Sequence, residues 1–261
     1  MKLTCTVVCA IIAFTTPVFA GGGQEPRERT VPVDEGVPAS ISVTAGEHFT
    51  HKLRVMPLIR VSNAPQMAAW CETTDGEFLT TLFVTDRIAT QSWRGAPADP
   101  APTESIRRPE SLPVWSHRRG EIYADGLPVP TRENPMPDAV TTATPKADFR
   151  MATLLPRGHE TLVVYFEVNH SADFNESFTA EAEETDENYS GGEWGSGQPA
   201  LVYRTEVNMP DIRAGKPVAL ELVGYASADG SNGEITENLE LITTADEIIE
   251  TVRLMVDGTD R

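Results

Sequence analysis

One short segment of this 261-residue chain collects residue types that could be chemically modified. It runs from Asp138 to Pro145 and reads Asp-Ala-Val-Thr-Thr-Ala-Thr-Pro. Small side chains keep such a segment accessible, so a threonine hydroxyl could be presented there to a modifying enzyme. The same residue types also form hydrogen-bonded Asx and threonine turns. The residues alone favour the turn and leave the modification open.

Histidine and cysteine give weaker signals. His48 and His51 are three positions apart, and on a strand this spacing points them to opposite faces, so we expect structural or surface histidines rather than zinc ligands. Cys71, beside Trp70, is expected to be a small buried core residue. The sequence has no nucleophile elbow, zinc-protease helix, phosphate-binding loop or dinucleotide-binding turn. We therefore expect a protein that is not an enzyme and has no metal site.

Two regions could instead recognise a partner. Trp194 lies in the glycine-rich stretch 191–197, where it could stack on a ligand or plug the edge of the fold. Trp115 lies in an apolar setting that suggests core packing, but it stands beside Arg118 and Arg119 in a locally basic segment. We take Trp194, Trp115, Arg118 and Arg119 as a possible interaction surface.

Acidic residues dominate the second half of the chain. The run 173–187 has no lysine or arginine and is expected to be a solvated acidic loop. The segment 229–234 looks superficially like a calcium loop, but it has too few carboxylates for a cation cage, so a turn is the better interpretation.

The elements that must position these residues are mostly strands. Apolar residues alternate around 41–43, 53–55, 162–169, 201–207, 218–225 and 252–256. The clearest unit is a hairpin over 66–85, in which Asp75-Gly76 forms the turn and Phe78, Leu82 and Val84 share one face. Thr244 and Glu247 could cap a short C-terminal helix. The pattern predicts an all-β, antiparallel, immunoglobulin-like sandwich.

A proline-rich insertion interrupts this pattern. Ten of the 20 prolines fall in the 55 positions 94–148, where they disfavour regular structure. A loop of this length inside a domain is usually functional or disordered. Its cluster Leu112-Pro113-Val114-Trp115 predicts partial docking onto the core.

The first residues have the features of a signal peptide. Lys2 precedes a short apolar run, and Val18 and Ala20 fit the positions read by the peptidase. We expect residues 1–20 to be removed after Ala20, residues 21–38 to be a disordered lead-in, and 39–261 to form one domain. The mature chain would be periplasmic or secreted, without a membrane span.

Charge narrows the class of partner. Loss of Lys2 with the signal peptide leaves 20 basic against 39 acidic residues, a formal charge of −19. Such a surface disfavours nucleic acid and anionic lipid and favours cationic partners. Together with the predicted export, this makes a protein of the cell envelope the expected partner.

Several segments together resemble a known family. They are Pro65-Gln66-Met67-Ala68-Ala69-Trp70, Thr81-Leu82-Phe83-Val84-Thr85, Leu112-Pro113-Val114-Trp115 and Asp138 to Pro145. Their order and spacing over about residues 50–170 are similar to the predicted periplasmic proteins called domain of unknown function 2271. The resemblance implies secretion and an immunoglobulin-like sandwich, and it implies no established activity. After residue 148 the chain departs from that family's pattern.

Part of the same segment resembles a flavin acceptor motif. Asp138, Thr141, Ala143 and Thr144 are similar to the motif of periplasmic flavin-carrying proteins, in which a transferase links FMN to the last threonine. The resemblance implies FMN on Thr144. Thr142 stands where that motif has glycine, which removes easy access to positive backbone angles.

Two hypotheses follow. The preferred one is a non-enzymatic binding or structural module of the cell envelope, with its interaction surface in the loops around 94–148 and 170–198. The alternative is an electron-transfer accessory protein that carries FMN on Thr144.

Overall fold

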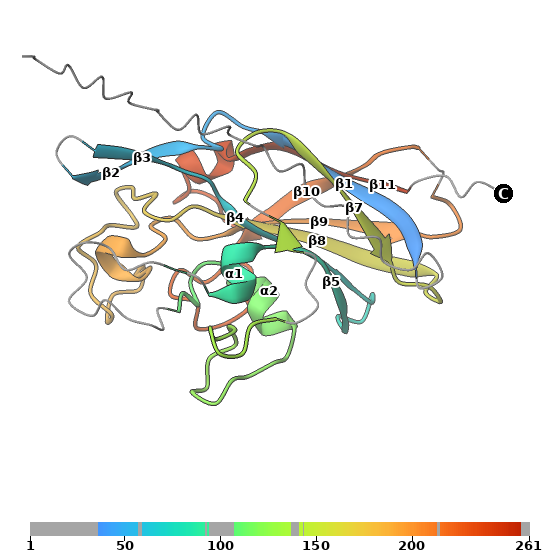
Figure 1. Cartoon of the computed structure of the whole chain (residues 1–261), viewed down its shortest axis with the longest axis horizontal. Coiled ribbons are helices and arrows are strands. Elements are labelled where there is room, and N and C mark those ends of the chain that lie inside the picture. The colour runs from blue at the N-terminus through green and yellow to red at the C-terminus, as the bar shows by residue number, and fades with distance from the viewer. Residues whose placement is uncertain are drawn as a thin grey trace, which may run out of the picture.

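The computed structural model describes residues 36–56, 59–91, 93, 107–136, 141–142, 144–212 and 215–256, with the backbone alone for 53–56, 59–61 and 141–142. The predicted signal peptide, residues 21–35 of the predicted lead-in and residues 94–106 of the proline-rich insertion lie outside these residues. Val37 and Pro38 already belong to the first strand, so the lead-in ends earlier than predicted. The described part is mostly β, with short helices (Figure 1).

The strands and helices follow in this order. The strands are β1 (Val37–Ala45), β2 (His51–Met56), β3 (Ile59–Asn63), β4 (Gln66–Glu72), β5 (Phe78–Thr85), β6 (Thr141–Thr142), β7 (Phe149–Leu155), β8 (Thr161–Asn169), β9 (Leu201–Asn208), β10 (Val218–Tyr225) and β11 (Ile249–Val256). The helices are α1 (Asp86–Thr90), α2 (Pro113–Arg118) and the 3₁₀ turns η2 (Gly192–Trp194) and η3 (Thr244–Glu247).

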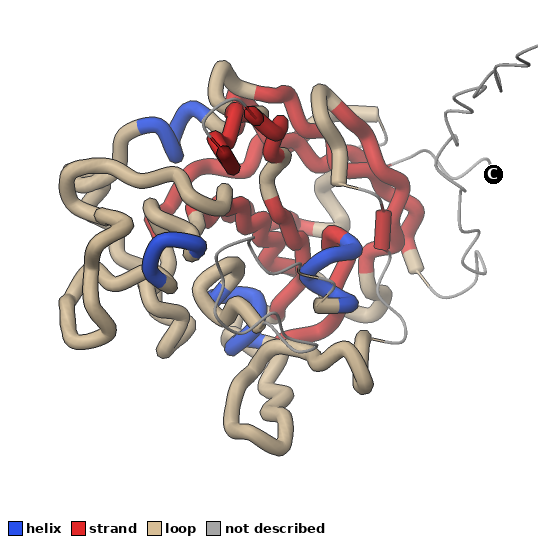
Figure 2. Tube along the Cα trace, turned by 60° about the vertical axis from the view of Figure 1, so that its left-hand side comes forward, coloured by secondary structure: helices blue, strands red, loops and turns tan. Residues whose placement is uncertain are grey.

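Nine of the described strands form one continuous sheet in the order β6-β5-β4-β8-β9-β10-β11-β1-β7. Neighbours are antiparallel except β5 and β6, and β2 and β3 form a separate ribbon. The sheet curls until its two ends approach (Figure 2). There the Thr153 hydroxyl of β7 donates to the Leu82 carbonyl of β5 at 3.2 Å, and the Phe83 and Phe149 rings lie 6.0 Å apart. The result is nearly a barrel.

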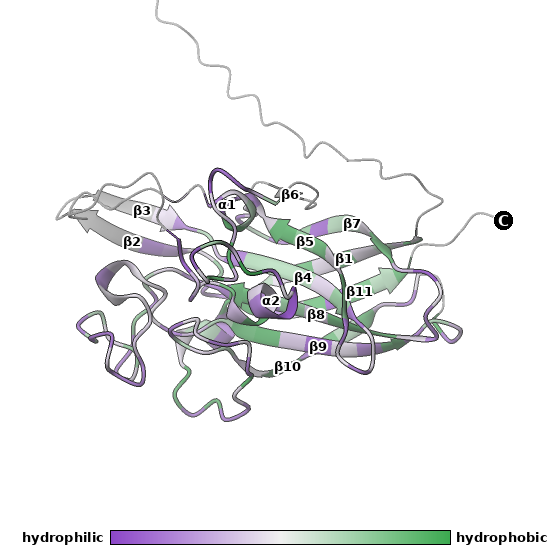
Figure 3. Cartoon of the chain, turned by 90° about the horizontal axis from the view of Figure 1, so that it is seen from below, coloured by the Kyte–Doolittle hydropathy of each residue, from purple (hydrophilic) through white to green (hydrophobic). Residues whose placement is uncertain are grey.

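The core lies inside this curl, and a second apolar layer covers part of its outer face. The expected alternation in β8 is confirmed, because Leu162, Val164, Phe166 and Val168 enter the inner core while Val163 and Tyr165 enter the outer layer. Alternate side chains on a strand point to opposite faces, so β8 is apolar on both. Hydrophobic residues are concentrated in the strands of the sheet, whereas most of the hydrophilic residues lie in the loops (Figure 3).

The hairpin of β4 and β5 is confirmed. Gly76 has a φ of 84°, which a glycine adopts without strain, and the turn closes with Thr73 N–H donating to the Glu77 carbonyl at 2.9 Å. The expected shared face of β5 is wrong, because the register shifts twice in this ladder. A bulge changes which face the following residues occupy, so Leu82 and Phe83 enter the inner core while Val84 enters the outer layer.

Three other expectations have mixed outcomes. The docking of Leu112 to Trp115 is confirmed, since all are buried, and Pro113 begins α2. The C-terminal helix is present only as η3, and its predicted cap is wrong because Thr243 is the N-cap and makes no side-chain cap. Strand β7 was not predicted; its register follows from pairing with β1, which local sequence does not encode.

The finer sandwich prediction is not confirmed, because the nine strands belong to a single curled sheet. Within the described ranges, no helix combines the length and apolar character needed to cross a membrane.

Candidate functional site

The acceptor-like segment lies at an edge of the sheet. Thr141 and Thr142 form β6, which pairs in parallel with Val84 and Thr85 at the end of β5. Thr144 follows and is partly buried. Asp138 and Ala143 lie outside the described residues, so the structure places only part of the motif.

A buried carboxylate fixes helix α2 to the outer face of the sheet. Glu167 of β8 accepts the backbone N–H groups of Val114 at 3.1 Å and Trp115 at 2.8 Å. Pro113 at the first helical position has no N–H to donate, and the apolar side chain of Leu112 cannot accept a hydrogen bond from the helix. Glu167, from another element, therefore accepts the free backbone N–H groups at the start of the helix. Burial raises the pKa of Glu167 to about 8, against the opposing effect of the two hydrogen bonds.

Glu72 of β4 holds the other end of α2. It is buried, accepts the indole N–H of Trp70 at 2.7 Å, and lies 3.6 Å from the guanidinium of Arg118. Trp70 stacks on Tyr165 with ring centroids 5.0 Å apart. The partly exposed Arg118 is therefore engaged with the protein itself.

Trp115 packs in the core, as its apolar setting predicts, and Arg119 is almost wholly covered, so neither belongs to an interaction surface and that part of the prediction is wrong. Trp115 is buried, and its indole N–H donates to Thr81 Oγ1 at 3.1 Å. Arg119 lies 4.8 Å above the Trp115 ring and pairs with Glu121, with only 3% of its own side chain exposed. Both residues stabilise the outer layer, Trp115 by burying a large apolar ring and Arg119 by lying over the face of that ring.

Trp194 ends η2 and is partly buried. Its carbonyl accepts the guanidinium of Arg108, which also lies 5.1 Å over the Trp93 ring and 3.5 Å from Glu110. Burial raises the pKa of Glu110 to about 7, although Arg108 lowers it. The glycine-rich stretch is thus tied to the outer layer through Arg108, and the two interpretations of Trp194, stacking on a ligand or plugging the edge of the fold, stay predictions.

Residues 119–136, here called the anchored loop, project from this layer at the bottom of Figure 1. At its ends, Arg119 N–H donates to the Trp115 carbonyl at 3.2 Å and Met136 N–H to the Ala89 carbonyl at 3.1 Å. In its middle, Arg107 donates to the Val129 carbonyl, pairs with Asp125 and lies 5.6 Å over the Tyr123 ring. The loop is held in place rather than free.

The anchored loop presents an apolar side chain beside a hollow. Ile122 is 63% exposed, the most exposed large hydrophobic residue among the side chains that the structure describes. The hollow has a volume of about 360 Å³ and is lined by Glu121, Ile122, Tyr123, Ala124, Asn134 and Pro135. This volume lies at the lower end of the range for small-molecule sites and suits one large side chain.

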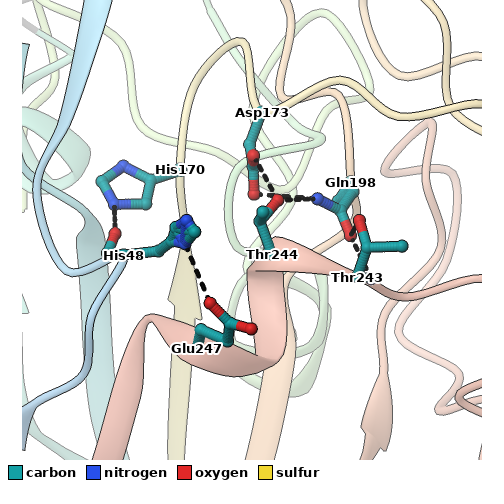
Figure 4. Close-up of polar contacts among 7 residues, drawn as sticks. All are labelled: His48, His170, Asp173, Gln198, Thr243, Thr244 and Glu247. Atoms are coloured by element: carbon teal, nitrogen blue, oxygen red, sulfur yellow. Dashed lines mark hydrogen bonds and ion pairs between the residues drawn. The ribbon is translucent and has the colours of Figure 1, made fainter.

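Figure 4 shows a second polar cluster. It lies where β1 and β8 end and β9 and β11 begin, at one open end of the nearly closed sheet, here called the mouth of the barrel. Asp173, just after β8, accepts the Thr244 hydroxyl at 2.7 Å and the Gln198 amide at 3.0 Å. Gln198 accepts the Thr243 N–H at 2.7 Å. Gly197 has a φ of 76°, and a Cβ there would meet the Asp173 backbone at 2.5 Å, so glycine allows the close approach of these segments.

Histidines complete this cluster. His170 is buried, and its Nε2 lies 3.0 Å from the His48 carbonyl and 3.1 Å from the Phe49 carbonyl. Carbonyls only accept, so Nε2 carries the proton and Nδ1 is the bare nitrogen. The His51 ring lies 4.6 Å from that of His170, edge to face, and His48 Nδ1 contacts Glu247 Oε2 at 3.1 Å. The expectation that His48 and His51 are structural or surface residues is consistent with these contacts.

Burial shapes the ionisation of the cluster. It lowers the pKa of His170 to about 4, lowers that of His51 and raises that of Asp173. Within the described part of the chain, no three His, Cys, Asp or Glu side chains are placed to hold a metal ion together. The cluster therefore joins loops through hydrogen bonds and two neutral imidazoles.

The acidic residues after Asp173 behave as expected. Glu176, Glu181, Glu183, Glu184, Asp186 and Glu187 are exposed, whereas Asp173 is partly buried in the cluster. Asp229 accepts the Ser231 N–H at 2.9 Å, as expected for a turn at 229–234.

The most informative residues were not singled out by sequence reasoning. Glu167 lies in a strand that is apolar on both faces, and this pattern is itself a signal for a buried, hydrogen-bonded carboxylate. His170 directly follows the same strand. The exposure of Ile122 could not be predicted from the sequence, because it depends on how the anchored loop is held by the rest of the fold.

Comparison of the chain with protein families, curated proteins and solved structures finds no match.

Proposed function

We propose that this chain is an exported, non-enzymatic binding module of the cell envelope whose anchored loop contacts a partner protein. Loops held by a rigid scaffold are the usual carriers of binding residues. The resemblance to the domain of unknown function 2271 proteins, the immunoglobulin-like sandwich and the cleavage after Ala20 remain predictions within this proposal.

The observation that carries the proposal is the exposure of Ile122 beside the hollow. A single exposed apolar side chain is ordinary by itself. Here it lies on a loop fixed at both ends and at Arg107, so little conformational entropy is lost when a partner binds. A pre-ordered apolar contact next to a hollow is a suitable docking point for one partner side chain.

Charge supports a basic partner. Glu121, Asp125 and Glu133 of the anchored loop are exposed together with one basic residue, Arg132, and the chain without residues 1–20 carries a formal charge of −19. Glu121 and Asp125 contact Arg119 and Arg107, but their side chains remain 61% and 48% exposed. A partner segment with an apolar side chain flanked by lysine or arginine fits these features.

Photo-crosslinking in the native envelope tests this proposal. A benzophenone amino acid replaces Ile122 in one variant and, as the matched control, Leu241, which is 39% exposed, in the other. The proposal predicts a discrete crosslinked protein from position 122 and none from 241. The same product from both positions, or none from 122, would contradict it.

The alternative is covalent FMN on Thr144. It is favoured by the position of Thr144 beside the edge strand β6, because an edge segment is accessible to a modifying enzyme. Intact mass after co-expression with an FMN transferase is the test, with Thr144→Ala as the variant that must lose the flavin. Thr142→Gly should increase the modified fraction, and a colourless, unmodified chain in every case would rule this function out.

A further inference from the structure

We propose that His51 and His170 form a proton-sensitive latch, which releases the β1–β2 turn (residues 46–50) from the mouth of the barrel when the pH falls. This inference does not depend on the anchored loop or its partner.

The closed latch is made of hydrogen bonds from two sides. His170 Nε2 donates to the carbonyls of His48 and Phe49, and Phe49 is buried in the inner core. From η3 and the residue after it, the Glu247 carbonyl accepts His48 N–H at 3.0 Å and the Ile248 carbonyl accepts Gly46 N–H at 2.9 Å. The turn is thus fastened to the segment after β8 and to η3.

The latch has no place for an added proton. His170 Nδ1 and His51 Nε2 are both buried and have no hydrogen-bond partner among the described residues. The two rings are 4.6 Å apart, so charging both would place two cations in contact. A buried N–H without an acceptor costs the desolvation of that group, so a proton on His170 Nδ1 favours the open turn, where water accepts it.

Neighbouring charges compensate only in part. Asp173 from the segment after β8 attracts a proton on His51, but it already accepts from Thr244 and Gln198. His48 from the turn repels charge on both rings. Glu247 from η3 contacts His48 at a largely exposed position, where an ion pair is weak.

The direction of the pH effect follows from linkage. The pKa of His170 is about 4 in the closed form and 6.5 in its unperturbed form. The open turn therefore binds more protons, so the closed turn is favoured above pH 6.5 and loses that preference as the pH falls towards 4.

Hydrogen exchange of the full chain at pH 7.5 and pH 5, corrected for intrinsic rates, tests the latch. The amides of Gly46 and His48 should open at least about tenfold more at pH 5, while amides of β8 stay protected. His170→Gln keeps a donor for the two carbonyls but cannot take the proton, and His51→Phe keeps the ring contact without a nitrogen. Both variants should reduce the pH effect, and His159→Gln, in the turn between β7 and β8, should not.

The proposal is overturned if the turn stays equally protected at both pH values, or if β8 and the turn open together. It is also overturned if His170→Gln keeps the full pH effect. Opening of the turn at pH 7.5 by a chelator would mean that a bound metal ion holds the pair.

Discussion

At the scale of single residues, Glu167 joins the sheet to its outer layer. Its two carboxylate oxygens occupy the N-terminal end of α2, the helix from which the anchored loop departs. Removing a hydrogen-bonded buried group costs more than the bond itself contributes, because its partners are left without water. The orientation of the proposed binding loop thus depends on a carboxylate from a different element.

Glu167→Gln should show a pH-dependent cost. The folded pKa of about 8 lies above the usual 4.5, so the folded chain keeps a proton that the unfolded chain releases between these values. Stability from this group is present below pH 4.5 and is lost as the pH rises through 8. Glutamine cannot ionise, and its amide NH2 would face a backbone N–H that it cannot accept, as the oxygen of a protonated carboxyl can. We therefore expect the unfolding free energy to fall by about 1–3 kcal/mol at pH 5.

Urea unfolding at pH 5 and pH 8 measures this effect. The difference in unfolding free energy between the native chain and Glu167→Gln should shrink by at least about 1 kcal/mol at the higher pH. The exposed Glu237→Gln is the matched control and should follow the native chain at both pH values. A difference that is the same at pH 5 and pH 8 would contradict the assigned ionisation.

Single residues were predictable where burial follows from an apolar pattern. Cys71 and Trp70 are buried as expected, because both faces of β4 are covered. Core packing of Trp115 is also predictable from its apolar setting, whereas its inclusion with Arg119 in a possible interaction surface follows from the locally basic segment and is wrong. The sequence does not show that the Trp115 backbone N–H binds Glu167 or that its indole binds Thr81, because both partners lie on distant strands.

At the scale of elements, β7 at one end of the curled sheet almost meets β5, which lies next to the other end. Alternation predicts β5 but not β7, whose register follows from its pairing with β1. The approach of the two strands cannot be predicted from either one, because it depends on the twist accumulated over the strands between them. The bulges in the β4–β5 ladder were missed because Leu82, Phe83 and Val84 are consecutive apolar residues, so alternation alone does not show where the face changes.

Thr153→Val tests whether the approach of these ends contributes to stability. Valine keeps the shape of threonine but removes the hydroxyl that donates to Leu82. The unfolding free energy should fall by about 1 kcal/mol, the usual net contribution of one hydrogen bond. Thr161→Val in β8 is the control because no side-chain hydrogen bond is lost there, and an equal loss in both variants would contradict a role for the contact.

At the scale of the whole molecule, the chain has an excess of acidic residues and a curled, nearly closed sheet from which the anchored loop projects. The mostly β, antiparallel class was predictable from alternation alone. The surface proposed for the partner lies within the proline-rich insertion that the sequence indicates. The sequence does not indicate Ile122, because prolines show where regular structure stops but not which side chain faces solvent.

Salt should weaken capture of the proposed basic partner. Electrostatic steering acts mainly on the association rate and is screened beyond about 8–10 Å at physiological ionic strength. Raising the salt from about 50 mM to about 500 mM should slow association by at least about tenfold and change dissociation less. Surface plasmon resonance with the crosslinked partner measures both rates, and an association rate that does not respond to salt would contradict a basic partner.

The most direct test of the proposed function is the dissociation constant of that partner for Ile122→Ala. Truncating a central apolar contact typically costs about 2 kcal/mol or more of binding free energy. The account predicts a dissociation constant at least about tenfold higher for Ile122→Ala, an unchanged one for Leu241→Ala, and the same melting temperature for both variants. An unchanged dissociation constant for Ile122→Ala would show that the anchored loop is not the binding surface.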